Sequence, residues 1–138
     1  MIIRTSLLST LTLALVGLAS YVAVADIKRL SAIPDALLGS WATSADDCRS
    51  AKESYMVLSA TTYVNSDVNC TVDWVSETAG TRGSIYSAHL RCAKPGGKPT
   101  SSNVVIRQRD VNHILAGPTF NSLRTFGRCG TTEPAATK

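Results

Sequence analysis

Four cysteines, Cys48, Cys70, Cys92 and Cys129, are the residues of this 138-residue chain whose type and spacing point most directly to a chemistry. They are separated by 21, 21 and 36 residues. Protein zinc sites usually pair their ligands about two to four residues apart, and none of these gaps has that spacing. An even number of cysteines in a small chain of an oxidising compartment instead predicts a disulfide framework. We therefore expect two disulfides and neither a metal site nor a cofactor.

Two histidines and one pair of carboxylates are the other side chains that could take part in catalysis. His89 is expected on a polar strand face and His113 beside a turn, where a solvated surface histidine is favoured over a general base. Asp46-Asp47 lies in a segment that we interpret as a loop, and adjacent side chains there point apart. The sequence contains no nucleophile elbow, no His-Glu-x-x-His and no phosphate-binding loop. The chain is therefore not expected to be an enzyme, and no catalytic residue is assigned.

The N-terminal region has the pattern of a secretory signal peptide. A single charge, Arg4, precedes the apolar run Leu7–Leu18, and Ala23-Val24-Ala25 supplies the small residues that a signal peptidase recognises. A cut near Ala19 is a weaker alternative. The apolar run is shorter than the roughly 20 residues that a membrane span needs. We expect a signal peptide at residues 1–25, no later transmembrane segment, and export to the periplasm or the extracellular space.

The remaining chain is small and mildly basic. Removal of Arg4 with the signal leaves 13 of the 14 Lys and Arg residues against 10 Asp and Glu, a net charge of +3. The basic residues are scattered, which gives no case for a nucleic-acid partner. We expect one domain over residues 26–130 and a flexible tail over residues 131–138.

The sequence after Gly39 has the pattern of short β-strands. Residues rich in Val, Ile, Thr and Tyr alternate with polar ones and are interrupted by Gly, Asn, Ser and Asp. Such strands joined by short turns predict an all-β fold, a small antiparallel up-and-down barrel, with a sandwich as the alternative. One helical turn is expected at residues 36–38, and a Gly- and Pro-rich loop at 94–102. The eight expected strands are 39–43, 54–59, 61–65, 68–76, 84–92, 103–109, 113–116 and 123–129.

A hairpin around Thr81 places Cys70 opposite Cys92, because the two cysteines are equally far from it. Directly opposed residues of antiparallel strands lie within disulfide reach. Continuing the same register puts an apolar set of side chains on one strand face. The core is therefore predicted to contain Trp74 and Leu90, together with Val72 and Ala88.

The remaining cysteines, Cys48 and Cys129, follow the first expected strand and end the last one. In a closed meander these strands are neighbours, so the second bridge would fasten the barrel. The loop-entropy model assigns about 3 kcal/mol to the inner bridge and about 4.5 kcal/mol to the outer one. The other two connectivities of four cysteines stay open at the level of sequence.

The tripeptide Gly39-Ser40-Trp41 supports a resemblance to known barrels. Together with Cys48, the run Tyr86-x-Ala88-x-Leu90-x-Cys92 and the run Thr125-Phe126-x-Arg128-Cys129, it resembles a group of small exported bacterial proteins without assigned activity. It is more distantly similar to periplasmic metalloprotease inhibitors and to lipocalin-like barrels. The resemblance implies that Trp41 plugs a closed barrel end in the core. It also implies an N-terminal inhibitory trunk, equivalent here to residues 26–34.

These observations predict the class of protein rather than a named activity. We expect a small, monomeric, disulfide-stabilised binding protein whose partner is a protein, as in hydrolase inhibition, or a small apolar ligand. The alternative is a structural, envelope-associated interaction module without a small ligand. Basic residues gather on one expected outer strip, which either keeps the barrel soluble or attracts an acidic partner or membrane headgroups. The absence of interleaved aromatic residues favours the first of these two roles. The strip consists of Arg91, Arg107 and Arg109, with Lys94 and Lys98 in the adjoining loop.

Overall fold

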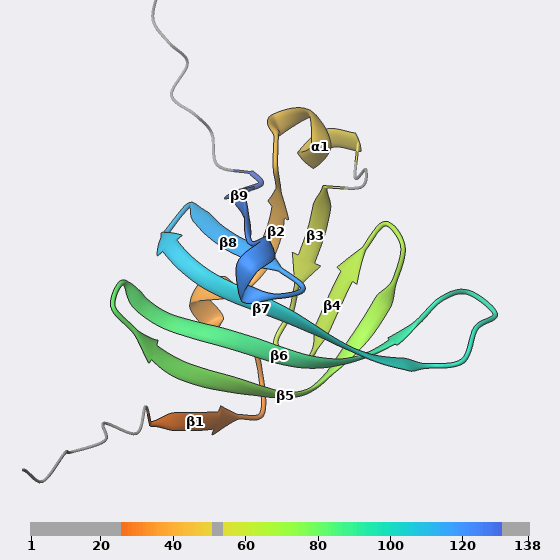
Figure 1. Ribbon diagram of the computed structural model, residues 1–138. Coiled ribbons are helices and arrows are strands. Elements are labelled where there is room, and N and C mark those ends of the chain that lie inside the picture. The colour runs from red at the N-terminus through yellow and green to blue at the C-terminus, as the bar shows by residue number, and fades with distance from the viewer. Residues whose placement is uncertain (1–25, 51–53, 131–138) are drawn as a thin grey trace, which may run out of the picture.

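The computed structural model describes residues 26–50 and 54–130. The signal peptide predicted at residues 1–25 and the tail predicted at residues 131–138 lie outside the described residues. Nine strands of the described chain join into one antiparallel sheet (Figure 1). In chain order they are β1 (Ile27–Leu30), β2 (Gly39–Ala42), β3 (Tyr55–Leu58), β4 (Thr62–Asn65), β5 (Asn69–Gly80), β6 (Gly83–Ala93), β7 (Thr100–Asp110), β8 (His113–Gly117) and β9 (Arg124–Arg128).

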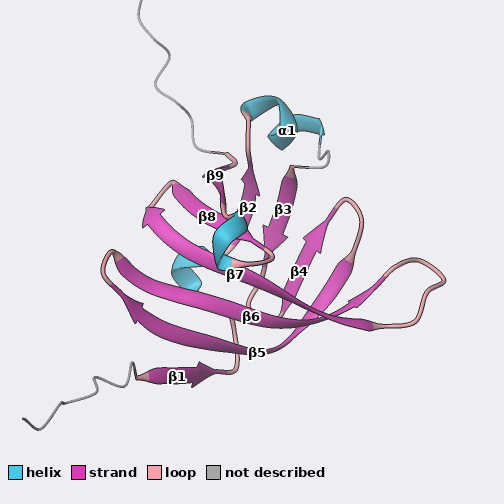
Figure 2. Ribbon diagram, in the orientation of Figure 1, coloured by secondary structure: helices cyan, strands magenta, loops and turns pink. Residues whose placement is uncertain are grey.

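Strands β2 to β9 close into an eight-stranded up-and-down barrel, as the sequence predicted. Each strand pairs with the next, and β9 pairs back with β2 through Trp41 opposite Arg128 and Ala42 opposite Gly127. This closure removes the free sheet edges that a sandwich would keep. Short helices also occur in the described part of the chain (Figure 2), namely η1 (Asp35–Leu37), α1 (Ala45–Ser50) and η2 (Phe120–Ser122).

Strand β1 is an addition that the sequence did not predict. It pairs with the far half of β5, where Ile27 lies opposite Thr78 and Leu30 opposite Val75. The neighbouring strand β4 covers only the first residues of β5, so the rest of that edge is open to β1. Residues 27–30 belong to the segment 26–34 that the resemblance likens to an inhibitory trunk, and they form a strand on the outside of the barrel (Figure 1).

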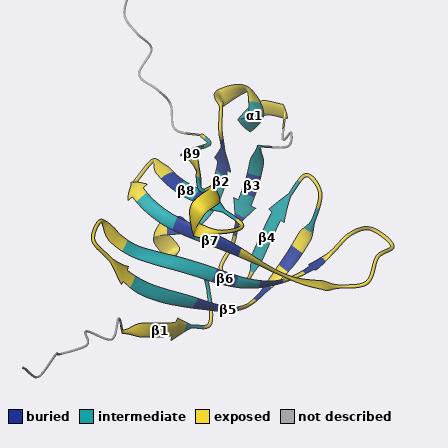
Figure 3. Ribbon diagram, in the orientation of Figure 1, coloured by how far each residue is buried: buried dark blue, intermediate teal, exposed yellow. Residues whose placement is uncertain are grey.

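The core lies inside the barrel and draws buried residues from β2, β3, β5, β6, β7 and β8 (Figure 3). Trp41 is fully buried and Leu90 is 3% exposed, so both predicted core positions are confirmed. The buried residues of β3, β7 and β8 alternate with less buried ones, as the two-residue period of side chains requires. Its other large apolar members are Ile33, Leu37, Met56, Leu58, Val72, Val75, Val104, Ile106 and Ile114.

The prediction that Trp74 belongs to the core is wrong. The β5–β6 turn has two central residues, with Gly80 paired to Gly83, so the hairpin cannot be centred on Thr81. A β-bulge between Val72 and Trp74 inserts one extra residue and shifts the register by one. Beyond the bulge Val75, not Trp74, faces the interior, and Trp74 is turned to the outer face.

The same bulge explains why the cysteine pairing survives. The two-residue turn shifts the strand register by one residue from the predicted one, and the extra residue of the bulge shifts it back. Cys70 therefore lies opposite Cys92 and Val72 opposite Leu90, as predicted. Both predicted disulfides form: Cys70–Cys92 inside the barrel and Cys48–Cys129 between α1 and the end of β9.

Two local assignments also differ from the sequence prediction. Asp46-Asp47 lies in α1 rather than in a loop, because Ser44 accepts a hydrogen bond from the backbone N–H of Asp47 and donates its hydroxyl to the Asp47 carboxylate. This is a Ser-x-x-Asp cap, a recognised start of a helix. The loop predicted at residues 94–102 is shorter, since β7 already begins at Thr100, which pairs with Cys92.

Candidate ligand-binding site at the barrel mouth

One end of the barrel is closed by the segment that precedes β2. The helical turn η1 lies there, and its Leu37 is fully buried. The carbonyl of Leu37 accepts a hydrogen bond from the indole Nε1 of Trp41 at 3.0 Å. The indole is therefore buried with its only polar group satisfied. The expectation that Trp41 closes a barrel end agrees with this geometry.

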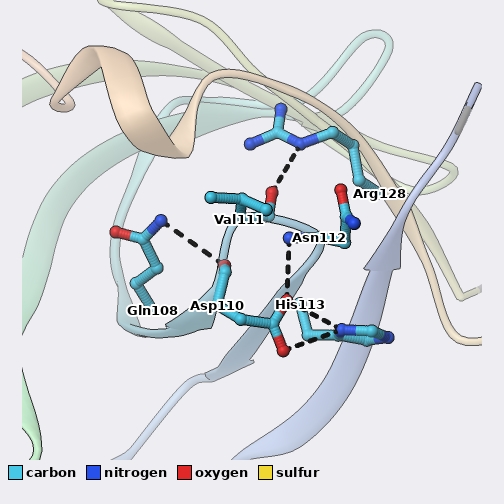
Figure 4. Close-up of polar contacts among 6 residues, drawn as sticks. All are labelled: Gln108, Asp110, Val111, Asn112, His113 and Arg128. Carbon is cyan, nitrogen blue, oxygen red and sulfur yellow. Dashed lines mark hydrogen bonds and ion pairs between the residues drawn. The ribbon is translucent and has the colours of Figure 1, made fainter.

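Arg128, at the end of β9, completes this closed end. Its guanidinium lies 4.2 Å from the centre of the Trp41 ring, within the range of a cation–π interaction. It also donates a hydrogen bond to the carbonyl of Val111 at 3.0 Å (Figure 4). Two more of its hydrogen bonds go to the carbonyls of Leu38 at 2.6 Å and Ala36 at 3.0 Å. One side chain thus connects β9 with the η1 segment and with the β7–β8 turn.

Gly39 makes the approach of this arginine possible. A Cβ atom on Gly39 would lie 2.9 Å from Nη1 of Arg128, and the φ of Gly39 is +128°. Both conditions favour glycine, since other residues rarely adopt such a φ. The glycine and the tryptophan of the Gly-x-Trp tripeptide therefore belong to one local arrangement with Arg128.

A polar turn lies beside the closed end. Asp110 accepts a hydrogen bond from the backbone N–H of Asn112 at 2.8 Å and pairs with Nδ1 of His113 at 2.9 Å (Figure 4). The Asn112 hydrogen bond, followed by the contact with His113, holds the pKa of the Asp110 carboxyl below its ordinary value. His113 is half exposed and sits where the sequence placed it, at the start of a strand beside a turn.

The opposite end of the barrel is open and contains a cavity of about 320 Å³. Because neighbouring strands run in opposite directions, β2, β4, β6 and β8 all start at the η1 end of the barrel and finish at the other end. The strands β3, β5, β7 and β9 start at that other end. Residues from the ends of β4, β6 and β8 and the starts of β3, β7 and β9 line this cavity, so it lies away from η1. The lining residues are Met56, Tyr63, Asn65, Val68, Leu90, Cys92, Ser102, Asn103, Val104, Ala116, Gly117, Pro118, Ser122, Arg124 and Phe126.

The depth of the cavity is apolar. Met56, Leu90, Val104 and Ala116 are buried core residues that form part of its wall. The hydroxyl of Tyr63 is held by a hydrogen bond from Asn65 Nδ2 at 3.2 Å, and burial raises the pKa of that hydroxyl. A mostly apolar wall with a few oriented polar groups is the usual composition of a small-molecule site.

The rim of the cavity carries a basic side chain and a helical turn. Arg124 lines the cavity, and within the described chain its side chain has no hydrogen-bond or ion-pair partner. The turn η2 lies next to it and is fastened by reciprocal hydrogen bonds between Thr119 and Ser122. Gly117 lets this turn approach β8, because a Cβ there would collide with the carbonyl of Ser122.

The sequence singled out few of the residues in these two sites. Leu90 lines the cavity and Trp41 the closed end, while Cys92 contributes to the cavity wall through the inner disulfide. Arg128 and Arg124 were assigned no role. The only sequence signal for Arg128 was its position directly before Cys129 in the last strand. Its hydrogen bonds depend on where the η1 turn lies in the fold, so residue spacing does not predict them.

Other features bear on the chemistry of the molecule. Among the described residues, no group of three or more His, Cys, Asp or Glu side chains could hold a metal ion. The described chain also has no helix long and apolar enough to cross a bilayer. Comparison of the sequence and fold with protein families, with curated proteins and with solved structures finds no match.

Proposed function

We propose that this protein is a small exported binding protein that takes a small apolar ligand into the mouth of its barrel. The observation that carries the proposal is the cavity of about 320 Å³ with an apolar wall, at the end opposite the Trp41–Arg128 closure. Ligand sites of small molecules occupy roughly 300–1,000 Å³, so this one suits a ligand at the small end of that range. Two disulfides are compatible with the oxidising compartment that export implies.

The neighbouring serines Ser101 and Ser102 of β7 give a matched test. Ser102 lies opposite the inward-facing Leu90 and lines the cavity, whereas Ser101 lies opposite the outward-facing Arg91. Both are exposed, so a large side chain at either position should leave the core intact. Ser102→Trp is expected to fill the mouth, and Ser101→Trp to leave it open.

Binding can be followed with 1-anilinonaphthalene-8-sulfonate, an aromatic anion whose fluorescence rises when its rings leave water for an apolar site. We expect saturable binding to the natural chain, a loss of at least about tenfold in affinity for Ser102→Trp, and a change under about twofold for Ser101→Trp. Equal affinity of all three proteins, or no saturable binding to any of them, would contradict the proposal.

Hydrolase inhibition through the N-terminal segment is the alternative, and it has less support. A trunk that enters a protease cleft must be free, whereas Ile27–Leu30 pair with β5 along the whole of β1. A purely structural module would leave the open cavity without a role. For these reasons the small-ligand proposal is preferred to both.

A further inference from the structure

The bulge in β5 places an aromatic residue on the outer face of the barrel. Trp74 is stacked on the ring of His89, with 3.6 Å between ring centres and 17° between their planes. The guanidinium of Arg29 lies 4.3 Å from the centre of the same indole. Because β1 and β6 pair with opposite edges of β5, Arg29 and His89 flank Trp74 from opposite sides.

Rows of paired residues extend this face across four strands. One row contains Ile27, Thr78, Ile85 and Arg107, and the next contains Arg29, Ser76, Ser87 and Val105. The face therefore mixes apolar and basic side chains over β1, β5, β6 and β7. Ile27 is 66% exposed, so the apolar part is not covered by the described chain.

The balance of charge on this face is positive. Arg91 is balanced by Asp73, which it contacts at 3.2 Å. Arg29 and Arg107 have no carboxylate partner among the described residues. Asp110, at the far end of β7, is already engaged by His113. The central part of the face thus retains two unbalanced guanidinium groups next to the partly buried Trp74 and the exposed Ile27.

We propose that this surface, the basic outer face formed by Arg29, Trp74, His89, Arg107, Ile27, Ile85 and Val105, docks on an anionic lipid surface. Arginine at such a surface is attracted to lipid phosphates, and an indole prefers the boundary between headgroups and acyl chains. The exposed Ile27 and the partly exposed Ile85 and Val105 add apolar area next to these groups. A soluble polyanion would use the charges and gain little from that apolar area, so the mixture favours a membrane.

The test measures binding of the full natural chain to vesicles by flotation. Vesicles of phosphatidylcholine are compared with the same vesicles containing phosphatidylglycerol, and a heparin fragment serves as the soluble polyanion. We expect binding only to the anionic vesicles. In 1 M salt, where the Debye length is about 3 Å, we expect most of that binding to be lost.

Arg107→Glu and Arg49→Glu form the matched pair of variants. They change net charge equally, but Arg49 lies in α1 and is paired with Asp46, away from the basic outer face. One basic residue near an anionic membrane contributes a factor of about five, so reversing Arg107 should weaken binding about 25-fold and reversing Arg49 should change it less than about threefold. Trp74→Ser reports on the apolar contribution and should weaken binding without altering its salt dependence.

Each variant is accepted only if its urea unfolding midpoint stays near that of the natural chain. Equal losses for Arg107→Glu and Arg49→Glu would overturn the proposal, because net charge alone would then explain the binding. Binding to heparin without binding to anionic vesicles would overturn the choice of a lipid surface. Absence of binding to anionic vesicles would overturn it as well. Ligand uptake at the barrel mouth, measured with Ser102→Trp, involves neither Arg107 nor Trp74, so the two proposals can fail separately.

Discussion

Replacement of Arg128 should open the closed end of the barrel and destabilise the protein. Its bond to the Leu38 carbonyl is partly buried, and a charged donor in that setting contributes about 2 kcal/mol. The stacking on the buried Trp41 adds about 1 kcal/mol, and the two more exposed bonds to Ala36 and Val111 together add about 1 kcal/mol. We expect Arg128→Ala to lower the free energy of unfolding by about 4 kcal/mol.

Urea unfolding under non-reducing conditions, followed by circular dichroism, measures this loss. For a domain of this size a slope of about 1.5 kcal/mol per molar urea converts 4 kcal/mol into a midpoint shift of about 2.7 M. Arg124→Ala is the matched control, because Arg124 lies on the same strand without a side-chain partner in the described chain. Its midpoint should move by less than about 0.5 M.

Arg128→Lys separates the role of the charge from that of the planar guanidinium. A lysine keeps the cation but cannot reach three carbonyls on different segments at once, so we expect it to recover about half of the loss. A lysine variant as stable as the natural chain would refute the reasoning, since it would show that the fork of donors is not needed. A loss for Arg124→Ala equal to that for Arg128→Ala would refute it too.

Three further results are expected. Replacing both cysteines of the Cys48–Cys129 bridge by Ala should lower the free energy of unfolding by about 4.5 kcal/mol, because the bridge spans 81 residues; a loss below about 1 kcal/mol in urea would contradict this loop-entropy argument. The pKa of Asp110 is lowered in the folded state, so its ionised form stabilises the fold above the unfolded pKa of about 3.9, and that contribution is lost as the pH falls through the folded pKa. The stability gap between the natural chain and Asp110→Asn should therefore be constant near pH 7 and shrink below about pH 4 in urea unfolding at a series of pH values; a gap that is independent of pH would argue against it. Iodide should quench the fluorescence of the natural chain but not that of Trp74→Phe, in which the fully buried Trp41 is the remaining tryptophan; strong quenching of that variant would mean that the closed end is accessible.

Most of the barrel was predictable because its strands alternate. The alternation of apolar and polar residues over 70–73 in β5 and 88–92 in β6, for example, has the period that a half-buried strand requires. The turn between β7 and β8 is marked by Asp110 and Asn112. The cysteine pairs were predictable for a related reason, since a disulfide demands that its two strands be neighbours. These signals depend on residues close in the chain or on a covalent bond.

The errors have a common physical origin in contacts that no local pattern records. The bulge before Trp74 shifts the strand register by one residue. The amino-acid sequence at the bulge does not differ in type from that of a regular strand, so it did not predict the shift. Strand β1 forms because β4 pairs with only the first residues of β5 and leaves the rest of that edge unpaired, which is a property of strand lengths in the folded sheet. The mouth cavity is lined by the small Ala116 of β8 and by Tyr63 of β4, two strands that do not pair with each other, and only the closed barrel brings these walls together.

The closure of the barrel also bears on the order in which it assembles. The hairpins of neighbouring strands join residues that are close in sequence, whereas β2 and β9 stand at opposite ends of the barrel sequence and share only two register pairs. Bringing such distant segments together has a large entropic cost before it gains many contacts, so we expect their pairing to form late and to limit the folding rate. The Cys48–Cys129 bond lies at this seam. Once the Cys48–Cys129 bond has formed, the pairing of β2 with β9 becomes hard to reverse. In a reduced chain we expect β2 and β9 to separate before the other strand pairs.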